Sequence, residues 1–70
     1  MDAQAQFGAT VRRLRLAAGL TQEQLGERCR MDLSAVSRLE RGERNPRLDT
    51  LVRLARALDV PPAALLEDVR

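Results

Sequence analysis

Several residue types that carry chemistry are absent from this 70-residue sequence. It has no histidine, tryptophan, tyrosine or lysine, and Phe7 is its only aromatic residue. Proteins that bind single-stranded nucleic acids rely largely on aromatic side chains on which the bases stack. The composition therefore argues against that class of binding protein.

Cysteine is almost absent as well, since Cys29 is the only one. One cysteine without histidines can form neither an internal disulfide nor a zinc site, so we expect no metal and interpret Cys29 as a core residue. The sequence also offers no glycine-rich phosphate loop and no obvious carboxylate pair. We therefore expect no enzyme, no cofactor and no small-molecule ligand.

The sequence contains no targeting or membrane segment that we recognise. Residues 1–4 lack the basic and apolar regions of a signal peptide, and no apolar run is long enough to span a bilayer. We expect a cytoplasmic protein that does not contact a membrane, with residues 1–70 as a single domain. A whole protein and a domain of a longer chain would share these features.

The charge is unevenly distributed along the chain. All twelve basic residues are arginines, and the formal net charge is +2. Residues 28–56 hold eight arginines and four acidic residues, a net charge of +4, whereas residues 1–27 are neutral and residues 57–70 carry −2. This pattern suits a chain that turns one face toward phosphates, although an ordinary solvated surface is the alternative.

Hydrophobic spacing predicts an all-α fold, a compact bundle of five short helices. Phe7, Val11, Leu14 and Ala18 recur at helical spacing, and Gly19 follows where a left-handed helix cap favours glycine. The fourth helix is expected at about residues 48–58, with Leu48, Leu51, Val52, Ala55 and Leu58 buried. A fifth is expected to begin at Pro62.

The second and third helices are predicted from their N-terminal signals. Thr21 and Gln24 have the spacing of a capping box, and Asp32 is a favourable N-cap for the next helix. Gly26 is expected to let another helix approach closely, and Gly42 to end the third helix. Because so few residues separate the two helices, residues 21–41 are predicted to form a helix-turn-helix.

Three runs of sequence resemble one family, the Cro/cI-like (XRE-type) helix-turn-helix repressors. These runs are Gly19-Leu20-Thr21-Gln22-Glu23, Val36-Ser37-Arg38-Leu39-Glu40-Arg41-Gly42, and Asn45-Pro46 with Leu48, Leu51 and Ala55. The resemblance covers about residues 7–66. It implies a transcriptional regulator that binds double-stranded DNA with its third helix in the major groove, as a homodimer on a two-fold site.

The resemblance also implies residue roles. Gln22 matches a glutamine that contacts the DNA backbone, and Arg15 and Glu40 match a structural ion pair. The positions that face base edges are Leu33, Ser34, Ser37 and Arg38, and the phosphate-contacting positions are Arg41, Arg44 and Arg47. For Leu33, a partly buried capping contact is the alternative. The family usually has glycine where this chain has Arg30, so we expect a strained positive φ there.

The C-terminal segment is a candidate dimer contact. Leu65 and Leu66 are adjacent, so one helix cannot turn both toward its own core. We expect Leu65 in the core and Leu66, with Val69, at a self-complementary surface. The alternatives are a monomer until DNA pairs two copies, and a protein-interaction module such as an antitoxin. The basic middle segment favours DNA.

Overall fold

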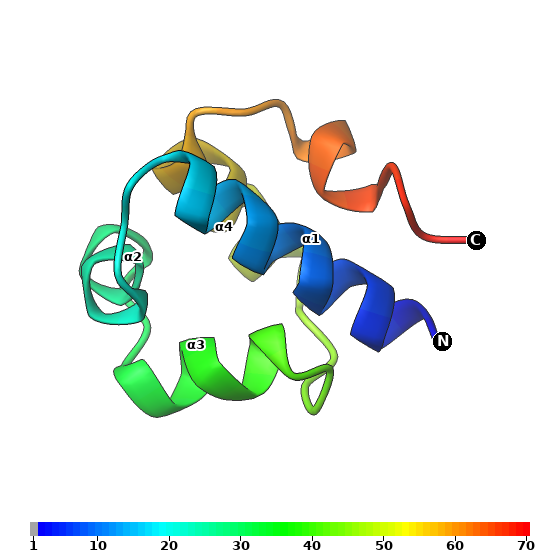
Figure 1. Ribbon diagram of the computed structural model, residues 1–70, viewed down its shortest axis with the longest axis horizontal. Coiled ribbons are helices and arrows are strands. Elements are labelled where there is room, and N and C mark those ends of the chain that lie inside the picture. The colour runs from blue at the N-terminus through cyan, green and yellow to red at the C-terminus, as the bar shows by residue number, and fades with distance from the viewer. Residues whose placement is uncertain (1) are drawn as a thin grey trace.

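The computed structural model describes residues 2–70 of the chain. This part contains four α-helices and one 3-10 helix, joined by short turns and loops (Figure 1). They are α1 (Ala3–Ala17), α2 (Gln22–Cys29), α3 (Leu33–Glu40), α4 (Leu48–Leu58) and the 3-10 helix η1 (Pro62–Leu66). The expected fifth α-helix is therefore wrong, and the five-residue η1 takes its place. Its first residue, Pro62, is a favourable first residue for a helix, but a segment of only five residues is typical of a 3-10 helix.

The helix ends follow local signals in the sequence. The capping box of α2 is formed, with the Gln24 backbone N–H donating to Thr21 Oγ1 at 3.0 Å and the Thr21 N–H donating to Gln24 Oε1 at 2.9 Å. Asp32 caps α3 by accepting from the Ala35 N–H at 2.7 Å. Both predicted caps are confirmed, and they satisfy backbone donors that have no partner inside the helix.

The core lies where α1, α2, α3, α4 and η1 meet. Its buried apolar residues are Phe7, Val11, Leu20, Leu25, Cys29, Val36, Leu39, Leu54, Ala55, Leu58 and Leu65. Leu65 is fully buried and Leu66 is 46% exposed, as expected from their adjacency. Ala18 is exposed, however, because α1 ends one residue before it.

The buried face of α4 agrees with the predicted one at Ala55 and Leu58 but differs from it nearer the start of the helix. Leu48 is 79% exposed, whereas Leu54, which was not expected in the core, is fully buried. Leu51 and Val52 are only partly buried. The helix carries apolar residues on two faces, and packing against α2 and η1 selects the face that contains Leu54 and Leu58.

Two glycines mark places where the backbone is approached closely. A Cβ on Gly8 of α1 would lie 2.7 Å from the carbonyl oxygen of Glu40 and would also meet that of Leu39. A Cβ on Gly26 would meet the carbonyl of Met31 in the turn after α2 and would lie 3.5 Å from Val36 Cγ2 of α3, so this glycine allows a close approach by both the turn and the next helix. Arg30, in this turn, has φ 60° and ψ 43°, the left-handed conformation expected from the sequence.

The contact at Gly8 gives a stability prediction. In a helix that nothing approached, Gly8→Ala would stabilise the protein by about 0.8–1 kcal/mol through helix propensity. Here the added methyl group meets the carbonyls of α3, so we expect a net loss of about 1–3 kcal/mol in the free energy of unfolding, measured in urea.

The matched control is Gly19→Ala. Gly19 has φ 72°, but a Cβ there would have no neighbour within 4 Å. That substitution should cost only the backbone strain, about 1 kcal/mol. A Gly8→Ala protein as stable as the unmodified one would show that α1 and α3 are less closely packed than described.

Candidate nucleic-acid interface

The pair α2 and α3 has the arrangement of a helix-turn-helix. The two helices are joined by Arg30, Met31 and Asp32, and the positive φ of Arg30 reverses the chain within this turn. In Figure 1, α3 lies along the lower edge of the molecule, on the opposite side from η1. One face of α3 is therefore free to contact a partner.

A buried ion pair fixes α3 against α1. Arg15 Nε donates to Glu40 Oε2 at 2.7 Å and Arg15 Nη2 donates to Glu40 Oε1 at 3.1 Å. The side chains are only 9% and 2% exposed. Arg15 Nη1 also donates to the Leu20 carbonyl at 2.8 Å. This two-point geometry restrains both distance and rotation between the helices.

Gln22 joins the same cluster. Its side-chain Nε2 donates to Glu40 Oε1 at 3.1 Å, and the residue is half-buried at the first position of α2. An amide nitrogen has two hydrogens, so one remains for another acceptor. The ion pair thus also orients the side chain that was expected to contact the DNA backbone.

The outer face of α3 carries the residues expected at base edges. Val36, Leu39 and Glu40 point into the protein, which turns the positions between them outward. Ser34 and Arg38 are exposed, Ser37 is half-buried and Leu33 is 50% exposed. The structure therefore brings all four side chains onto one accessible surface of α3.

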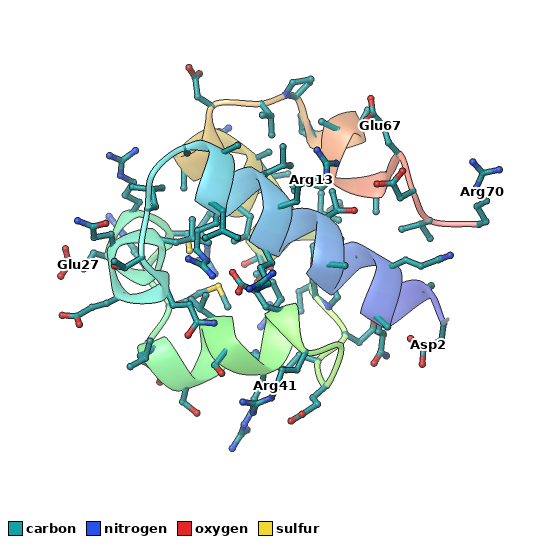
Figure 2. The ribbon with its side chains drawn as sticks, viewed as in Figure 1. Asp2, Arg13, Glu27, Arg41, Glu67 and Arg70 are labelled. Carbon is teal, nitrogen blue, oxygen red and sulfur yellow. The ribbon has the colours of Figure 1, made fainter. Side chains whose placement is uncertain are left out.

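The arginines that follow differ in how they are paired. Arg44 is exposed and makes no ion pair with any residue of the described range 2–70. Arg47 is 83% exposed, with its Nε 3.6 Å from Asp49 Oδ1. Arg41 projects away from the protein below α3 (Figure 2), and its Nε donates to Glu43 Oε2 at 2.9 Å.

No role for Glu43 was expected from the sequence, although this acidic residue lies among the arginines of the candidate interface. Its hydrogen bonds with Arg41 lower the pKa of its carboxyl group below the ordinary value, because they favour the charged form. The same interaction raises the pKa of Arg41. Part of the positive charge expected for DNA phosphates is therefore already neutralised within the protein.

The C-terminal segment contributes to a small apolar surface beside the N-terminal half of α1 and the loop before α4. Leu66 and Val69 border a groove of about 200 Å³ that Phe7, Pro46 and Leu51 also line. Val69 packs partly against the core. The two residues expected at a dimer contact therefore lie together, although Leu66 is the more exposed of them.

The described residues offer little for other kinds of chemistry. Cys29 is buried, its thiol donates to the Leu25 carbonyl at 3.1 Å, and burial raises its pKa, which disfavours the reactive thiolate. Between residues 2 and 70 no three potential metal ligands come together. Nor does this part of the chain contain a helix with the length and apolar character needed to cross a membrane.

This arrangement defines a helix-turn-helix DNA-binding domain, and comparison with known proteins gives its family. The sequence profile of the helix-turn-helix family matches residues 11–65. The chain belongs to this family, and within it to the XRE-type regulators. DNA-binding transcription regulation is the function that this membership carries.

Three similar proteins illustrate the relationship. C.BamHI, a control protein of Bacillus amyloliquefaciens, is 39% identical over 62 residues, covering 87% of this chain and 76% of that protein. An uncharacterized HTH-type transcriptional regulator of Sinorhizobium fredii, y4dJ, is 42% identical over 66 residues, covering 94% and 86%. The crystal structure of the restriction-modification controller protein C.AhdI of Aeromonas hydrophila superposes with a TM-score of 0.87 at 44% identity, covering 89% of this chain and 94% of that one.

The buried ion pair gives a second stability prediction. Glu40→Gln leaves the Arg15 charge buried without its partner, so we expect a loss of about 3–5 kcal/mol in the free energy of unfolding. The double variant Arg15→Met with Glu40→Leu should recover part of this loss, because it removes both buried charges. Urea denaturation followed by circular dichroism measures both effects.

An exposed ion pair in the same protein provides the control. Arg13 and Asp68 lie 3.6 Å apart, and their side chains are 58% and 61% exposed. Asp68→Asn should therefore cost less than about 1 kcal/mol. Equal losses for Glu40→Gln and Asp68→Asn would contradict the structural role given to the buried pair.

Proposed function

We propose that this chain is a sequence-specific transcriptional regulator that places α3 in the major groove of double-stranded DNA. The observation that carries the proposal is the outward face of α3, with Leu33, Ser34, Ser37 and Arg38 held on one surface by the buried Arg15–Glu40 pair. The width of the major groove admits one α-helix. The protein acts by binding and not by catalysis.

Each side chain has a role in this proposal that its chemistry suits. Arg38 is exposed and can donate two parallel hydrogen bonds to a guanine edge, whereas Leu33 can contact a thymine methyl group. Ser34 and Ser37 can bond to bases. Gln22 at the start of α2, and Arg44 and Arg47 in the loop between α3 and α4, contact phosphates, which position the protein without reading sequence.

The functional unit is a homodimer bound to a two-fold site. A single module of this kind buries only about 600–1,000 Å² on DNA, which favours two copies for tight binding. The partly exposed Leu66, with Val69 and the groove beside them, provides an apolar surface that a second copy can cover symmetrically. This is the only oligomer that the proposal requires.

The setting follows from the same activity. A regulator of this kind works in the compartment that holds its DNA, so the cytoplasmic location expected from the sequence remains part of the proposal. Because C.AhdI is a restriction-modification controller protein, DNA upstream of restriction-modification genes is the first natural sequence to test.

Selection on randomised duplex DNA tests the assignment of Arg38. Arg38→Ala should weaken binding to the preferred site by about 1–3 kcal/mol and relax the preference at one base pair of each half-site. Arg44→Ala should instead weaken binding to all sequences equally and reduce the salt slope by about one. If both variants lost affinity without a change in the selected site, Arg38 would be a phosphate contact.

Sedimentation of the free protein tests the dimer. Leu66→Glu places two charges in the apolar contact, so the variant should be monomeric at micromolar concentration where the unmodified protein is dimeric. Leu48→Glu is the matched control, because Leu48 is more exposed and lies on α4, outside the groove. Dimerisation that survives Leu66→Glu, or an unmodified protein that is monomeric, would refute the assignment.

A further inference from the structure

We propose that Glu43 is a positioning residue that acts through Arg41 to make Ser37 a hydrogen-bond donor toward DNA. The three side chains form a relay in which a carboxylate holds a guanidinium and the guanidinium holds a hydroxyl. The inference rests on the proposed function, because it concerns which base α3 selects. It assigns a sequence-reading role to an acidic residue that, by charge alone, would only repel DNA.

The first step of the relay is a two-point contact. Arg41 Nε donates to Glu43 Oε2 at 2.9 Å, and Arg41 Nη2 donates to Glu43 Oε1 at 3.3 Å. Two parallel hydrogen bonds between planar groups fix the orientation of the guanidinium as well as its position. The third nitrogen, Nη1, is thereby directed back along α3.

The second step joins this nitrogen to the recognition surface. Arg41 Nη1 donates to Ser37 Oγ at 2.9 Å, from one helical turn further along the chain. Arg41 cannot accept a hydrogen bond, so the direction of this bond is fixed. Ser37 therefore gives one of its two lone pairs to Arg41 and keeps its hydroxyl hydrogen.

The backbone holds Glu43 in position for this contact. After α3, the Glu43 N–H donates to the Arg38 carbonyl at 2.9 Å and the Gly42 N–H donates to the Leu39 carbonyl at 3.1 Å, the pattern of a Schellman motif. Gly42 has φ 76°, and a Cβ there would lie 2.8 Å from the Ala5 Cα. This turn is therefore locked against α1.

The relay restricts what Ser37 can read. A free serine hydroxyl can donate to a base or accept from one, so it discriminates poorly. One lone pair remains, but accepting from a charged donor polarises the hydroxyl toward donating, so Ser37 favours donation to a base over acceptance from one. Guanine, adenine and thymine present acceptors in the major groove, whereas cytosine presents only its N4 amino donor. We infer that Ser37 disfavours cytosine at the base that it faces.

The same pairing changes the role of Arg41 from the one that the family resemblance implied. Its charge is balanced by Glu43, so the pair adds no net charge toward the phosphates. Arg44 makes no ion pair within residues 2–70 and keeps its full charge for that purpose. Arg41 is thus mainly an orienting group, with two N–H hydrogens left over for DNA.

Binding selection on randomised duplex DNA with four proteins and one control variant tests the relay. They are the unmodified protein, Ser37→Ala, Glu43→Gln and Arg41→Lys, which keeps the charge but loses the planar two-point contact. Glu27→Gln is the matched control, since Glu27 is exposed on α2 and its removal also raises the net charge by one. Thermal unfolding of each variant verifies that the fold is retained.

We expect Ser37→Ala to lose the discrimination against cytosine at one base pair of each half-site, by about fivefold, the ratio that corresponds to one hydrogen bond. Glu43→Gln and Arg41→Lys should relax the same base pair and leave the others unchanged. Glu27→Gln should leave every position unchanged. Glu43→Gln should in addition steepen the salt dependence of affinity by about one unit, because one phosphate-facing charge is released.

The alternative outcomes separate the relay from the proposed function. If Glu43→Gln tightens binding to all sequences while the base preference remains, Glu43 only repels phosphate and the relay is wrong. If Ser37→Ala changes no position, Ser37 does not read a base and the relay is wrong. An unmodified protein that selects no sequence contradicts the proposed function itself.

A measurement without DNA tests the relay independently. In nitrogen-15 NMR spectra of the free protein, the Arg41 Nε–H should exchange with water more slowly than in Glu43→Gln. Equal exchange rates would show that the contact does not persist in solution, which overturns the relay even if the protein binds DNA.

Discussion

The buried ion pair between Arg15 and Glu40 is the interaction on which the recognition surface depends. It joins α1 to α3, and through Leu20 and Gln22 it also holds the chain at the entry to α2. A helix as short as α3 is not stable alone, so its orientation must come from tertiary contacts. Burying two charges is costly, and the surrounding hydrogen bonds offset much of that cost. The two hydrogen bonds of the pair fix the rotation of α3 relative to α1. Apolar contacts are less directional and restrain this rotation less.

Close backbone contacts complete this constraint. Gly8 brings α1 against the carbonyl groups at the end of α3, and Gly42 brings the following turn against Ala5 near the start of α1. One contact is made by Leu39 and Glu40 themselves and the other by the turn two residues after Glu40, so both hold the backbone around the ion pair close to α1. Together these contacts restrain α3 against rolling and sliding, which keeps Ser34, Ser37 and Arg38 on its outer face.

The sequence predicted those features that depend on neighbouring residues. The caps at Thr21 and Asp32 and the positive φ of Arg30 are local and were correctly expected. The buried face of α4 was predicted correctly at Ala55 and Leu58 but wrongly at Leu48 and Leu54, because a helix with apolar residues on two faces needs its packing partners to choose between them. The fifth helix was predicted from Pro62 alone, which is a favourable first residue for a helix. A segment of five residues is short enough to form a 3-10 helix instead. Gly8 gave no signal, since its partner lies more than thirty residues away.

In the candidate interface, too, some features follow from the sequence and others depend on the folded structure. The residues facing outward on α3 follow from helical periodicity and the family resemblance, whereas the pairing of Arg41 with Glu43 depends on the turn at Gly42 and could not be read from charge alone. In the sequence all the arginines look equivalent as contacts for phosphate. The structure divides them by their partners: Arg15 is structural, Arg41 is oriented by a carboxylate, and Arg38 and Arg44 make no ion pair within the described residues. Attraction to DNA depends on the net charge that remains, while selection among sequences depends on groups whose orientation is fixed before binding. An acidic residue beside the recognition helix can therefore cost affinity and still contribute to specificity.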